Sequence, residues 1–210
     1  LAILCLDNES IQDLIPKIKK RYITYGMSSQ ADFQIRDVVS EKRRSRFSVY
    51  RQGQKLGRII LNLPGIHNVY NATASIAVGL ELDVPMDAIE SALQTLEGVQ
   101  RRLEIKGEIN GITVVDDYGH HPTEIKTTLQ AIEECWPDNR KVIVFQPHRY
   151  TRTRDLFDEL TRAFNRADVL FLTEVYAAGE KPIEGVDARR LAEAIRAHGH
   201  RDVTFVEDRN

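Results

Sequence analysis

Two short polar stretches of this 210-residue chain carry side chains that could do chemistry. The first is Asp116–Glu124, where two acids, a phenol and two imidazoles crowd into six successive positions. The second is Gln146–Arg154, which contains His148, Arg149 and Arg152. Guanidinium groups match the oxygens of phosphates and carboxylates, and imidazole and carboxylate groups can also hold a metal ion. The two stretches could therefore form a site for an anionic ligand or for a metal.

The first stretch lies at a predicted strand-to-helix turn. Ile112–Val115 is an apolar run typical of a buried strand, and apolar residues recur at helical spacing over Ile125–Ile132. Pro122 suits the first turn of that helix, because its missing N–H would be unpaired there. In open α/β sheets, ligands bind at this end of the strands. The alternative is that Asp116 and Asp117 only cap the turn and that the histidines are solvated.

The second stretch follows another predicted strand, Lys141–Phe145, and opens a helix predicted to continue to Phe164. His148, Arg149 and Arg152 lie where a sheet of this kind would hold an anionic ligand. Cations at the N-terminus of a helix oppose the helix dipole, and a bound anion would offset that cost. The alternative is a charged, solvated start of the helix.

A third polar stretch contains Asn68 and Asn71, after a strand that Pro64 and Gly65 interrupt. Asn68 is predicted to be the N-cap of the following helix. Asn68 and Asn71 are three positions apart, so they can share one face of the first turn. An asparagine amide offers both a donor and an acceptor, as the edge of an adenine requires. The alternative is that Asn68 only caps and Asn71 is incidental.

The order of the predicted elements indicates an α/β fold class with two domains. Three strands within residues 33–63 follow one another without a helix, so part of that sheet is expected to be antiparallel. A helix opened by Pro85 ends near Glu97, where we place a domain boundary. From residue 112 onward strands alternate with helices, which predicts a mainly parallel sheet with crossover helices.

Two arginines begin the second domain. The run Arg101–Glu104 is predicted to start a strand, so Arg101 and Arg102 would point to opposite faces. The dipeptide Asn110-Gly111 predicts a type I′ turn that joins this strand to the next one as a hairpin. One of the two guanidinium groups could reach a bound phosphate, and the alternative is a solvated basic pair.

The composition excludes several classes of protein. Hydrophobic residues make up 42% and charged residues 29%, so a packed core is expected. The net charge of −2 argues against a nucleic-acid partner, and no apolar run approaches the roughly 20 residues that span a bilayer. Cys5 and Cys135 lie in apolar patterns, which fits a reducing cytosol. Because Leu1 lies within a predicted strand, we expect the chain to be part of a longer protein.

Three motifs resemble the Mur ligase family, whose ATP-dependent enzymes add amino acids to the UDP-muramoyl precursor of the bacterial cell wall. They are Gly65-x-His67-Asn68-x-x-Asn71-Ala72, Asp117-Tyr118-Gly119-His120 and Arg102-x-Glu104. The longer stretches Asp116–Glu124 and Phe145–Arg152 are similar to those of the family member that joins L-alanine to UDP-N-acetylmuramate. The resemblance covers nearly the whole chain.

The resemblance implies a domain organisation. The family has a UDP-binding domain, a central ATPase domain and a C-terminal Rossmann-like domain. Residues 1–97 would be the end of the central domain with a mixed sheet, and residues 98–210 most of the C-terminal domain. A phosphate-binding loop of the type Gly-x-x-Gly-Lys-Thr is expected upstream, and this chain contains none. The chain is therefore expected to be a fragment that is inactive alone, from a bacterial cytoplasmic enzyme, with the Mg²⁺ ligands mainly in the upstream part and no metal ligand assigned here.

The resemblance also implies roles for individual residues. ATP would phosphorylate the muramoyl carboxylate, and the amine of L-alanine would attack the acyl phosphate, so charge develops on phosphoryl oxygens and on an oxyanion. Asn68 and Asn71 would contact the adenine, Asp117 the ribose and Arg102 an ATP phosphate. Five residues would surround the muramoyl and alanine carboxylates: Tyr118, His120, His148, Arg149 and Arg152. Of these, His120, Arg149 and Arg152 are the expected catalytic residues.

Three alternatives stay open. A sister ligase attaches a recycled murein peptide to the same nucleotide sugar and shares the double histidine, but its next motif lacks the run His-Arg-Tyr-Thr-Arg. A metal-dependent hydrolase would use the ligands Asp116, Asp117, His120, His121 and His148. A non-catalytic module would bind a nucleotide or a peptidoglycan precursor without turnover.

Overall fold

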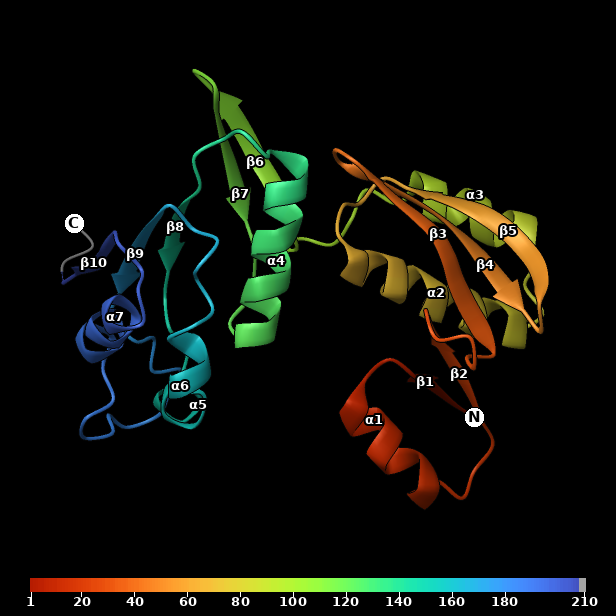
Figure 1. Ribbon diagram of the computed structural model, residues 1–210, viewed down its shortest axis with the longest axis horizontal. Coiled ribbons are helices and arrows are strands. Elements are labelled where there is room, and N and C mark those ends of the chain that lie inside the picture. Colours follow the sequence, from red (N-terminus) through yellow and green to blue (C-terminus); the bar gives the residue numbers. More distant parts are fainter. Residues whose placement is uncertain (208–210) are drawn as a thin grey trace. The chain divides into compact units, whose positions relative to one another are not determined.

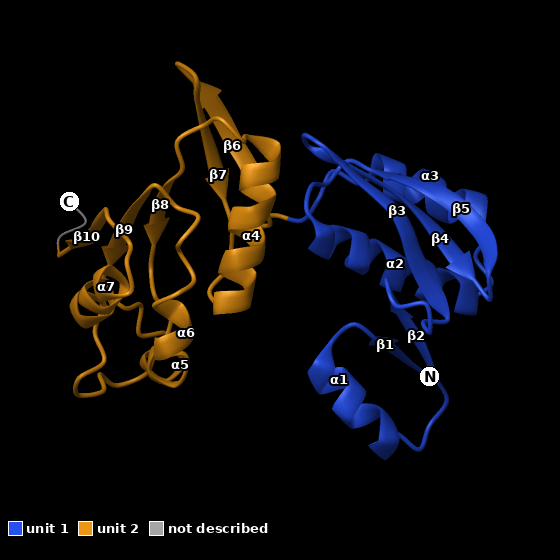
Figure 2. Cartoon of the chain, in the orientation of Figure 1, with its two compact units in different colours: residues 1–99 blue, residues 100–210 orange. Residues whose placement is uncertain are grey.

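The computed structural model of the protein describes residues 1–207. The chain forms two compact units, residues 1–99 (unit 1) and residues 100–210 (unit 2), as Figure 2 shows. Each unit has its own apolar core. Among the described residues, no helix is both long enough and apolar enough to cross a bilayer.

Unit 1 contains a mixed five-stranded sheet in the order β1-β2-β3-β4-β5 (Figure 1). The first three strands run parallel, and the last three are joined by antiparallel pairing. The expected mixed sheet is therefore confirmed. Its strands are β1 (Ala2–Cys5), β2 (Tyr22–Gly26), β3 (Phe33–Glu41), β4 (Arg44–Arg51) and β5 (Gln54–Leu61).

Helices bury one face of this sheet. Alternate side chains of a strand face opposite sides, so Phe33 and Ile35 enter the core while Gln34 and Arg36 do not. Helix α2 packs on β1 to β4, and α3 packs on β5. The helical segments are α1 (Glu9–Leu14), the 3₁₀ helix η1 (Ile15–Lys17), α2 (Ile66–Glu81) and α3 (Met86–Thr95).

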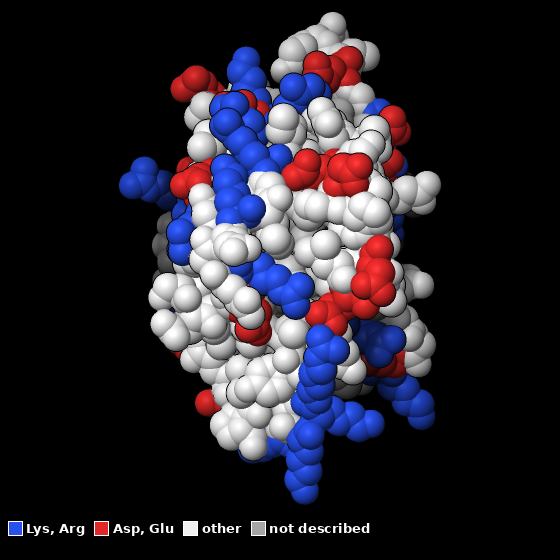
Figure 3. All heavy atoms as spheres, turned by 90° about the vertical axis from the view of Figure 1, so that its right-hand side faces the viewer, with Lys and Arg blue, Asp and Glu red and all other residues white. Residues whose placement is uncertain are grey.

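Both signs of charge occur on the surface of the molecule that Figure 3 shows. Lys and Arg side chains form a row there, and Asp and Glu side chains lie beside them. On the sheet of unit 1, the guanidinium of Arg36 lies 4.4 Å from the ring centre of Tyr50. Arg46 pairs with Glu41. The arginines of this sheet are therefore partly engaged with neighbouring side chains.

Unit 2 contains a hairpin and a separate parallel sheet. The hairpin joins β6 (Glu104–Ile109) to β7 (Ile112–Asp116). Asn110 and Gly111 both have positive φ, 50° and 78°, as a type I′ turn requires, so this prediction is confirmed. The parallel sheet has the order β10-β9-β8, from β8 (Val142–Phe145), β9 (Val169–Thr173) and β10 (Val203–Val206).

The mainly parallel sheet expected from residue 112 onward is confirmed for β8, β9 and β10, but it does not include β7. In the described part of the chain, β7 pairs with β6 and not with β8. A cavity of about 540 Å³ is lined by β7, β8 and the apolar face of α4, including Ile125, Leu129 and Ile132. Alternation of strands and helices predicts the connections between elements, but not which strands pair.

The helices of unit 2 are α4 (Pro122–Cys135), α5 (Tyr150–Asp155), α6 (Phe157–Leu160) and α7 (Ala188–Ala197). The helix predicted to run on to Phe164 is interrupted at Leu156, whose φ of −111° and ψ of 18° are not helical. Leu160 and Phe164 are nevertheless buried in the core. The helical spacing of these residues therefore reflected their burial rather than a continuous helix.

Candidate active site

The start of α2 holds the two candidate asparagines, Asn68 and Asn71. Gly65, with a φ of 88°, is the N-cap, so the prediction that Asn68 caps this helix is wrong. Asn68 lies inside the first turn, and its Nδ2 donates to the carbonyl oxygen of Pro64 over 2.7 Å. This bond uses one of the two donor hydrogens of the amide. Asn71 is exposed one turn further on.

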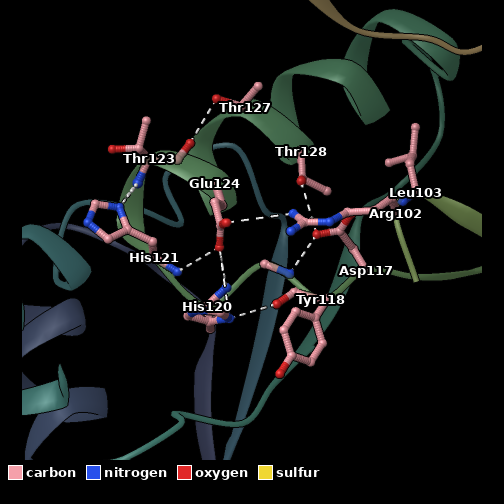
Figure 4. Close-up of polar contacts among 11 residues, drawn as sticks. Arg102, Leu103, Asp117, Tyr118, His120, His121, Thr123, Glu124, Thr127 and Thr128 are labelled. Carbon is pink, nitrogen blue, oxygen red and sulfur yellow. Dashed lines mark hydrogen bonds and ion pairs between the residues drawn. The ribbon is translucent and has the colours of Figure 1, made fainter. Parts of the chain in front are cut away.

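Asp117 holds the turn between β7 and α4 in place. Its Oδ1 accepts from the backbone N–H of Gly119 at 2.8 Å and from Oγ1 of Thr128 at 3.2 Å. Its Oδ2 accepts from the backbone N–H of Leu103 at 2.8 Å. Figure 4 shows these contacts converging on one carboxylate. Because a carboxylate has about four acceptor positions, these bonds leave room for roughly one further donor.

Glu124 lies in the first turn of α4, and its side chain caps the start of that helix. His121 is the N-cap of α4, and its Nδ1 accepts from the N–H of Thr123 at 3.2 Å. Oε2 of Glu124 accepts from the backbone N–H groups of His120 at 3.1 Å and His121 at 3.2 Å (Figure 4). These contacts form a capping box in which a histidine replaces the usual hydroxyl residue.

The carboxylate of Glu124 also lies near a cation. Its Oε1 is 3.6 Å from Nη1 of Arg102, so one side chain touches both the histidine turn and that arginine. Partial burial alone would raise the pKa of Glu124. The N–H groups of His120 and His121, together with the charges of His120 and Arg102, outweigh burial and lower the pKa below its usual value.

The two arginines before β6 do not begin a strand. Strand β6 starts at Glu104, and both Arg101 and Leu103 have positive φ, 56° and 49°. Arg101 and Arg102 therefore belong to a turn, and the expected placement on opposite faces of a strand is wrong. Nε of Arg101 lies 3.3 Å from Oδ2 of Asp116, and its guanidinium lies over the ring of Tyr118 at 4.9 Å.

Four rings form a row across the ends of β7, β8 and β9. Ring centres are 5.3 Å apart for Tyr118 and His120, 5.8 Å for His120 and His148, and 5.3 Å for His148 and Tyr176. The loops after β8 and β9 are joined by a parallel β-bridge between His148 and Tyr176. The structure thus brings the two polar stretches of unit 2 together, as expected for the carboxyl ends of neighbouring strands.

His148 is surrounded by cationic side chains. Burial lowers its pKa, and the charges of Arg152, His120 and Arg149 lower it further. Nη1 of Arg152 lies 3.1 Å from Nδ1 of His148. Because a guanidinium can only donate, Nδ1 is the acceptor and the imidazole is neutral, with its proton on Nε2. The site therefore presents one neutral imidazole N–H beside two guanidinium groups.

Arg149 has a strained backbone. It is the N-cap of α5, with a φ of 72° and a ψ of 137°, values that L-residues rarely adopt. Its N–H donates to the carbonyl oxygen of Tyr176 over 2.8 Å. Its own carbonyl oxygen accepts from the N–H and Oγ1 of Thr153 at 3.1 and 2.8 Å. Neighbouring groups therefore hold Arg149 in this conformation from both sides.

The five candidate metal ligands do not gather. Within residues 1–207, no three His, Cys, Asp or Glu side chains are placed to share a metal ion. Asp117 is engaged by three donors, and Nδ1 of His121 is used as a helix cap. The geometry therefore gives no support to a metal-dependent hydrolase.

Residues 101–210 match the family described as the Mur ligase, glutamate ligase domain. Residues 1–79 match the Mur ligase middle domain. The chain belongs to the Mur ligase family. The resemblance that its motifs carried, and the α/β fold class with a mixed sheet followed by a mostly parallel one, are both confirmed.

Two relatives of this Mur ligase chain carry the same name. The chain is 58% identical to UDP-N-acetylmuramate–L-alanine ligase of Desulfatibacillum aliphaticivorans over 97% of this chain and 44% of the relative. It is 54% identical to the enzyme of that name from Geobacter sulfurreducens over 100% of this chain and 45% of the relative. The chain thus spans less than half the length of these relatives.

Solved structures agree with this Mur ligase fold. The UDP-N-acetylmuramate–alanine ligase of Thermotoga maritima superposes with a TM-score of 0.74 at 28% identity, covering 89% of this chain and 39% of that one. A murein peptide ligase of Psychrobacter arcticus superposes with a TM-score of 0.69 at 22% identity, covering 98% and 43%. The second likeness concerns the fold alone.

Sequence reasoning missed three residues of the candidate site. Glu124 could have been found, because it follows the N-cap His121 by three positions, the spacing of a capping box. Tyr176 and Glu180 lie in the loop after β9, which carries no recognisable motif. They join the site only because parallel strands end at a common edge.

Removing the charge of Glu124 should destabilise this chain in a pH-dependent way. At neutral pH, Glu124→Gln should lower the melting temperature by about 1–4 °C, because the amide keeps an acceptor oxygen but loses a negative charge that contributes about 0.3–1 kcal/mol in the first turn of a helix. The folded-state pKa of Glu124 is lowered, so its stabilising effect is present above the ordinary value of about 4.3 and is lost as the pH falls through the folded value.

Thermal melts of both proteins between neutral and strongly acid pH measure this effect. The two melting temperatures should converge at the acid end. A difference that stays constant across the range would show that the carboxylate charge has no part in the cap.

Proposed function

We propose that this chain is part of an ATP-dependent ligase that joins L-alanine to UDP-N-acetylmuramate through an acyl phosphate, in peptidoglycan precursor synthesis. The observation that carries the proposal is the cluster of His120, His148, Arg149 and Arg152 at one edge of unit 2. These groups suit carboxylates and a phosphoryl group, which are the reacting parts of such substrates. The shared name of relatives that are 52–58% identical supports the same assignment.

In this proposal, the cationic groups bind the muramoyl and alanine carboxylates. Arg149 and Arg152 supply planar forks that each hold two oxygens, and the neutral His148 donates from Nε2 without adding charge. His120 and Tyr118 complete the surroundings of the substrate. The guanidinium groups stabilise the charge that develops on the phosphoryl oxygens and on the tetrahedral oxyanion as the amine of alanine attacks.

Four residues are proposed as contacts of ATP. Asn68 and Asn71 contact the adenine, Asp117 the ribose hydroxyls and Arg102 a phosphate. The half-exposed guanidinium of Arg102 and the exposed Asn71 are accessible to a ligand. Asp117 has less capacity to bind a ribose hydroxyl, because its carboxylate already accepts hydrogen bonds from three protein donors.

The domain assignment follows the same proposal. Residues 1–97 form the end of the central ATP-binding domain, and residues 98–210 form most of a C-terminal Rossmann-like domain. A bound Mg²⁺ would neutralise phosphate charge. The Mg²⁺ ligands are proposed to lie mainly in the upstream part of the ligase, and no metal ligand is assigned within this chain.

The sister ligase that attaches a murein peptide is the second candidate. Its fold is shared, at a TM-score of 0.69, but identity to that structure is only 22%. The run His148-Arg149-Tyr150-Thr151-Arg152 favours the alanine ligase. The third candidate, a non-catalytic binding module, concerns the chain taken alone.

Substrate competition in a full-length ligase that contains this chain separates these candidates. ADP release is measured with UDP-N-acetylmuramate and either L-alanine or the tripeptide L-alanyl-γ-D-glutamyl-diaminopimelate. Turnover with alanine supports the proposal. Turnover only with the peptide supports the sister ligase, and binding of ATP without any turnover supports the non-catalytic module.

Asp117→Ala in that ligase should weaken ATP binding and also loosen the turn. Loss of a hydrogen bond from a ribose hydroxyl to a charged group corresponds to roughly 1.5–3 kcal/mol of binding free energy. The three internal donors lose their acceptor as well, so the melting temperature of unit 2 should fall. Calorimetric titration with ATP, well below the melting temperature, measures the first effect.

Thr128→Val is the matched control for this substitution. It removes one internal bond to Asp117 while leaving the carboxylate for the ribose. ATP affinity should therefore stay close to that of the unmodified ligase. An unchanged ATP affinity of Asp117→Ala would contradict the ribose assignment.

A further inference from the structure

The loop after β9 is tied to the polar loop after β8 by backbone and side-chain bonds. The N–H of Tyr176 donates to the carbonyl oxygen of Pro147, and the N–H of Arg149 donates to that of Tyr176, each over 2.8 Å. Nε2 of Gln146 donates to the carbonyl oxygen of Glu174 at 3.1 Å. Parallel pairing thus continues beyond the ends of both strands, along the segment that carries His148 and Arg149.

The far end of the same loop reaches the start of α5. The carboxylate of Glu180 accepts from Oγ1 of Thr151 at 2.6 Å and from its backbone N–H at 2.9 Å. Thr151 follows Arg149 by two positions. The carbonyl oxygen of Tyr176 therefore holds the N–H of Arg149, while Glu180 holds the backbone N–H of Thr151, two positions later.

These contacts bear on the strain at Arg149. A non-glycine residue with a φ of 72° lies in a region that L-residues rarely adopt, and it persists there only where its surroundings determine it. Without the bonds from Thr151 to Glu180, the first turn of α5 could rotate towards ordinary dihedrals. The guanidinium of Arg149 would then leave the neighbourhood of His148.

We propose that Glu180 is a positioning residue, which holds Arg149 in its strained conformation by binding both donors of Thr151. The proposal rests on the proposed function, since it concerns how the carboxylate-binding arginine is oriented. The carboxylate of Glu180 is engaged by Thr151, so Glu180 is proposed to act through Arg149 and not on the substrate. Its carboxylate also lies close enough to Arg149 and His148 for its charge to act on them, so it compensates part of the positive charge gathered there.

Kinetics of Glu180→Ala in the full-length ligase that contains this chain test the positioning role. We expect kcat/KM for L-alanine and for UDP-N-acetylmuramate to fall at least about tenfold, while KM for ATP changes less than about twofold. Glu180→Gln keeps one acceptor oxygen for Thr151 and should restore part of the loss. Glu184→Ala removes a carboxylate from an exposed position of the same stretch and should leave all constants unchanged.

Hydrogen exchange gives a readout that does not depend on activity. In this 210-residue chain, the amide of Arg149 is protected by its bond to Tyr176. Its exchange should accelerate at least about tenfold in Glu180→Ala and stay unchanged in Glu184→Ala. If the unmodified ligase shows no alanine-dependent turnover, the proposed function fails and this exchange experiment alone decides the positioning of Arg149.

Two outcomes would overturn the proposal. Unchanged exchange at Arg149 in Glu180→Ala would show that the carboxylate does not hold the strained turn. An equal loss for alanine, UDP-N-acetylmuramate and ATP, unrelieved in Glu180→Gln, would show a general structural defect instead of positioning.

Discussion

Arg149→Gly should stabilise this chain slightly and inactivate the ligase that contains it. Glycine adopts a φ of 72° without steric cost, so the substitution releases roughly 1–3 kcal/mol of strain. Greater freedom of glycine in the unfolded chain costs about 0.5–1 kcal/mol of this gain. At the middle of these ranges the net gain is about 1 kcal/mol, so the melting temperature of the 210-residue chain should rise by about 2–4 °C. Loss of the guanidinium should reduce kcat/KM about a hundredfold or more, as expected for a group that stabilises developing charge.

Arg149→Lys is the matched control, because it keeps both the charge and the strained backbone. An ammonium cannot hold two oxygens in the planar geometry of a guanidinium, so kcat/KM should still fall by more than about tenfold, equivalent to about 1.4 kcal/mol. The melting temperature should stay nearly unchanged, because an exposed charge contributes little to folding.

Steady-state kinetics and thermal melts of the two variants separate function from structure. Near-normal kinetics of Arg149→Lys would refute the bidentate role and would favour the alternative, a charged and solvated start of α5. A lower melting temperature of Arg149→Gly would show that the arginine side chain, and not its backbone strain, determines stability at this position.

The chain alone should release no ADP from ATP in the presence of UDP-N-acetylmuramate and L-alanine. Backbone donors of a phosphate-binding loop and its lysine hold the transferred phosphates in such enzymes, and this sequence contains no such loop. The result expected from a coupled ADP assay is therefore the rate of the enzyme-free reaction. Alanine-dependent ADP release by the purified chain would refute the prediction and would require another phosphate site within these residues.

Local patterns predicted the elements well, because their causes are local. Three strands were predicted within residues 33–63, where β3, β4 and β5 lie, and the dipeptide Asn110-Gly111 specified its hairpin. The N-cap of α2 was predicted wrongly because two residues three positions apart, Gly65 and Asn68, could each fill that position. Gly65 takes it with a positive φ, and Asn68 binds the carbonyl oxygen of Pro64 instead.

Contacts that are distant in sequence could not be predicted in the same way. Residues of both polar stretches were identified, but Glu180 lies 29 positions from Thr151, and no local pattern relates them. Arg102 was wrongly assigned to a strand, because no local pattern predicts the positive φ of Arg101 and Leu103. The turn that contains them is held by bonds from residues 116–118, which are distant in the sequence. The roles of the site residues remain predictions until the variants above are measured.

The separation of β7 from β8 has a consequence for handling the chain in solution. In the described part of unit 2, β8 ends the parallel sheet, so one side of its backbone has no neighbouring strand. Val142 and Val144 are 50% and 71% exposed, and Ile112 of β7 is 62% exposed. Apolar strands with open edges can act as templates for pairing between molecules, so concentrated samples should aggregate through these segments.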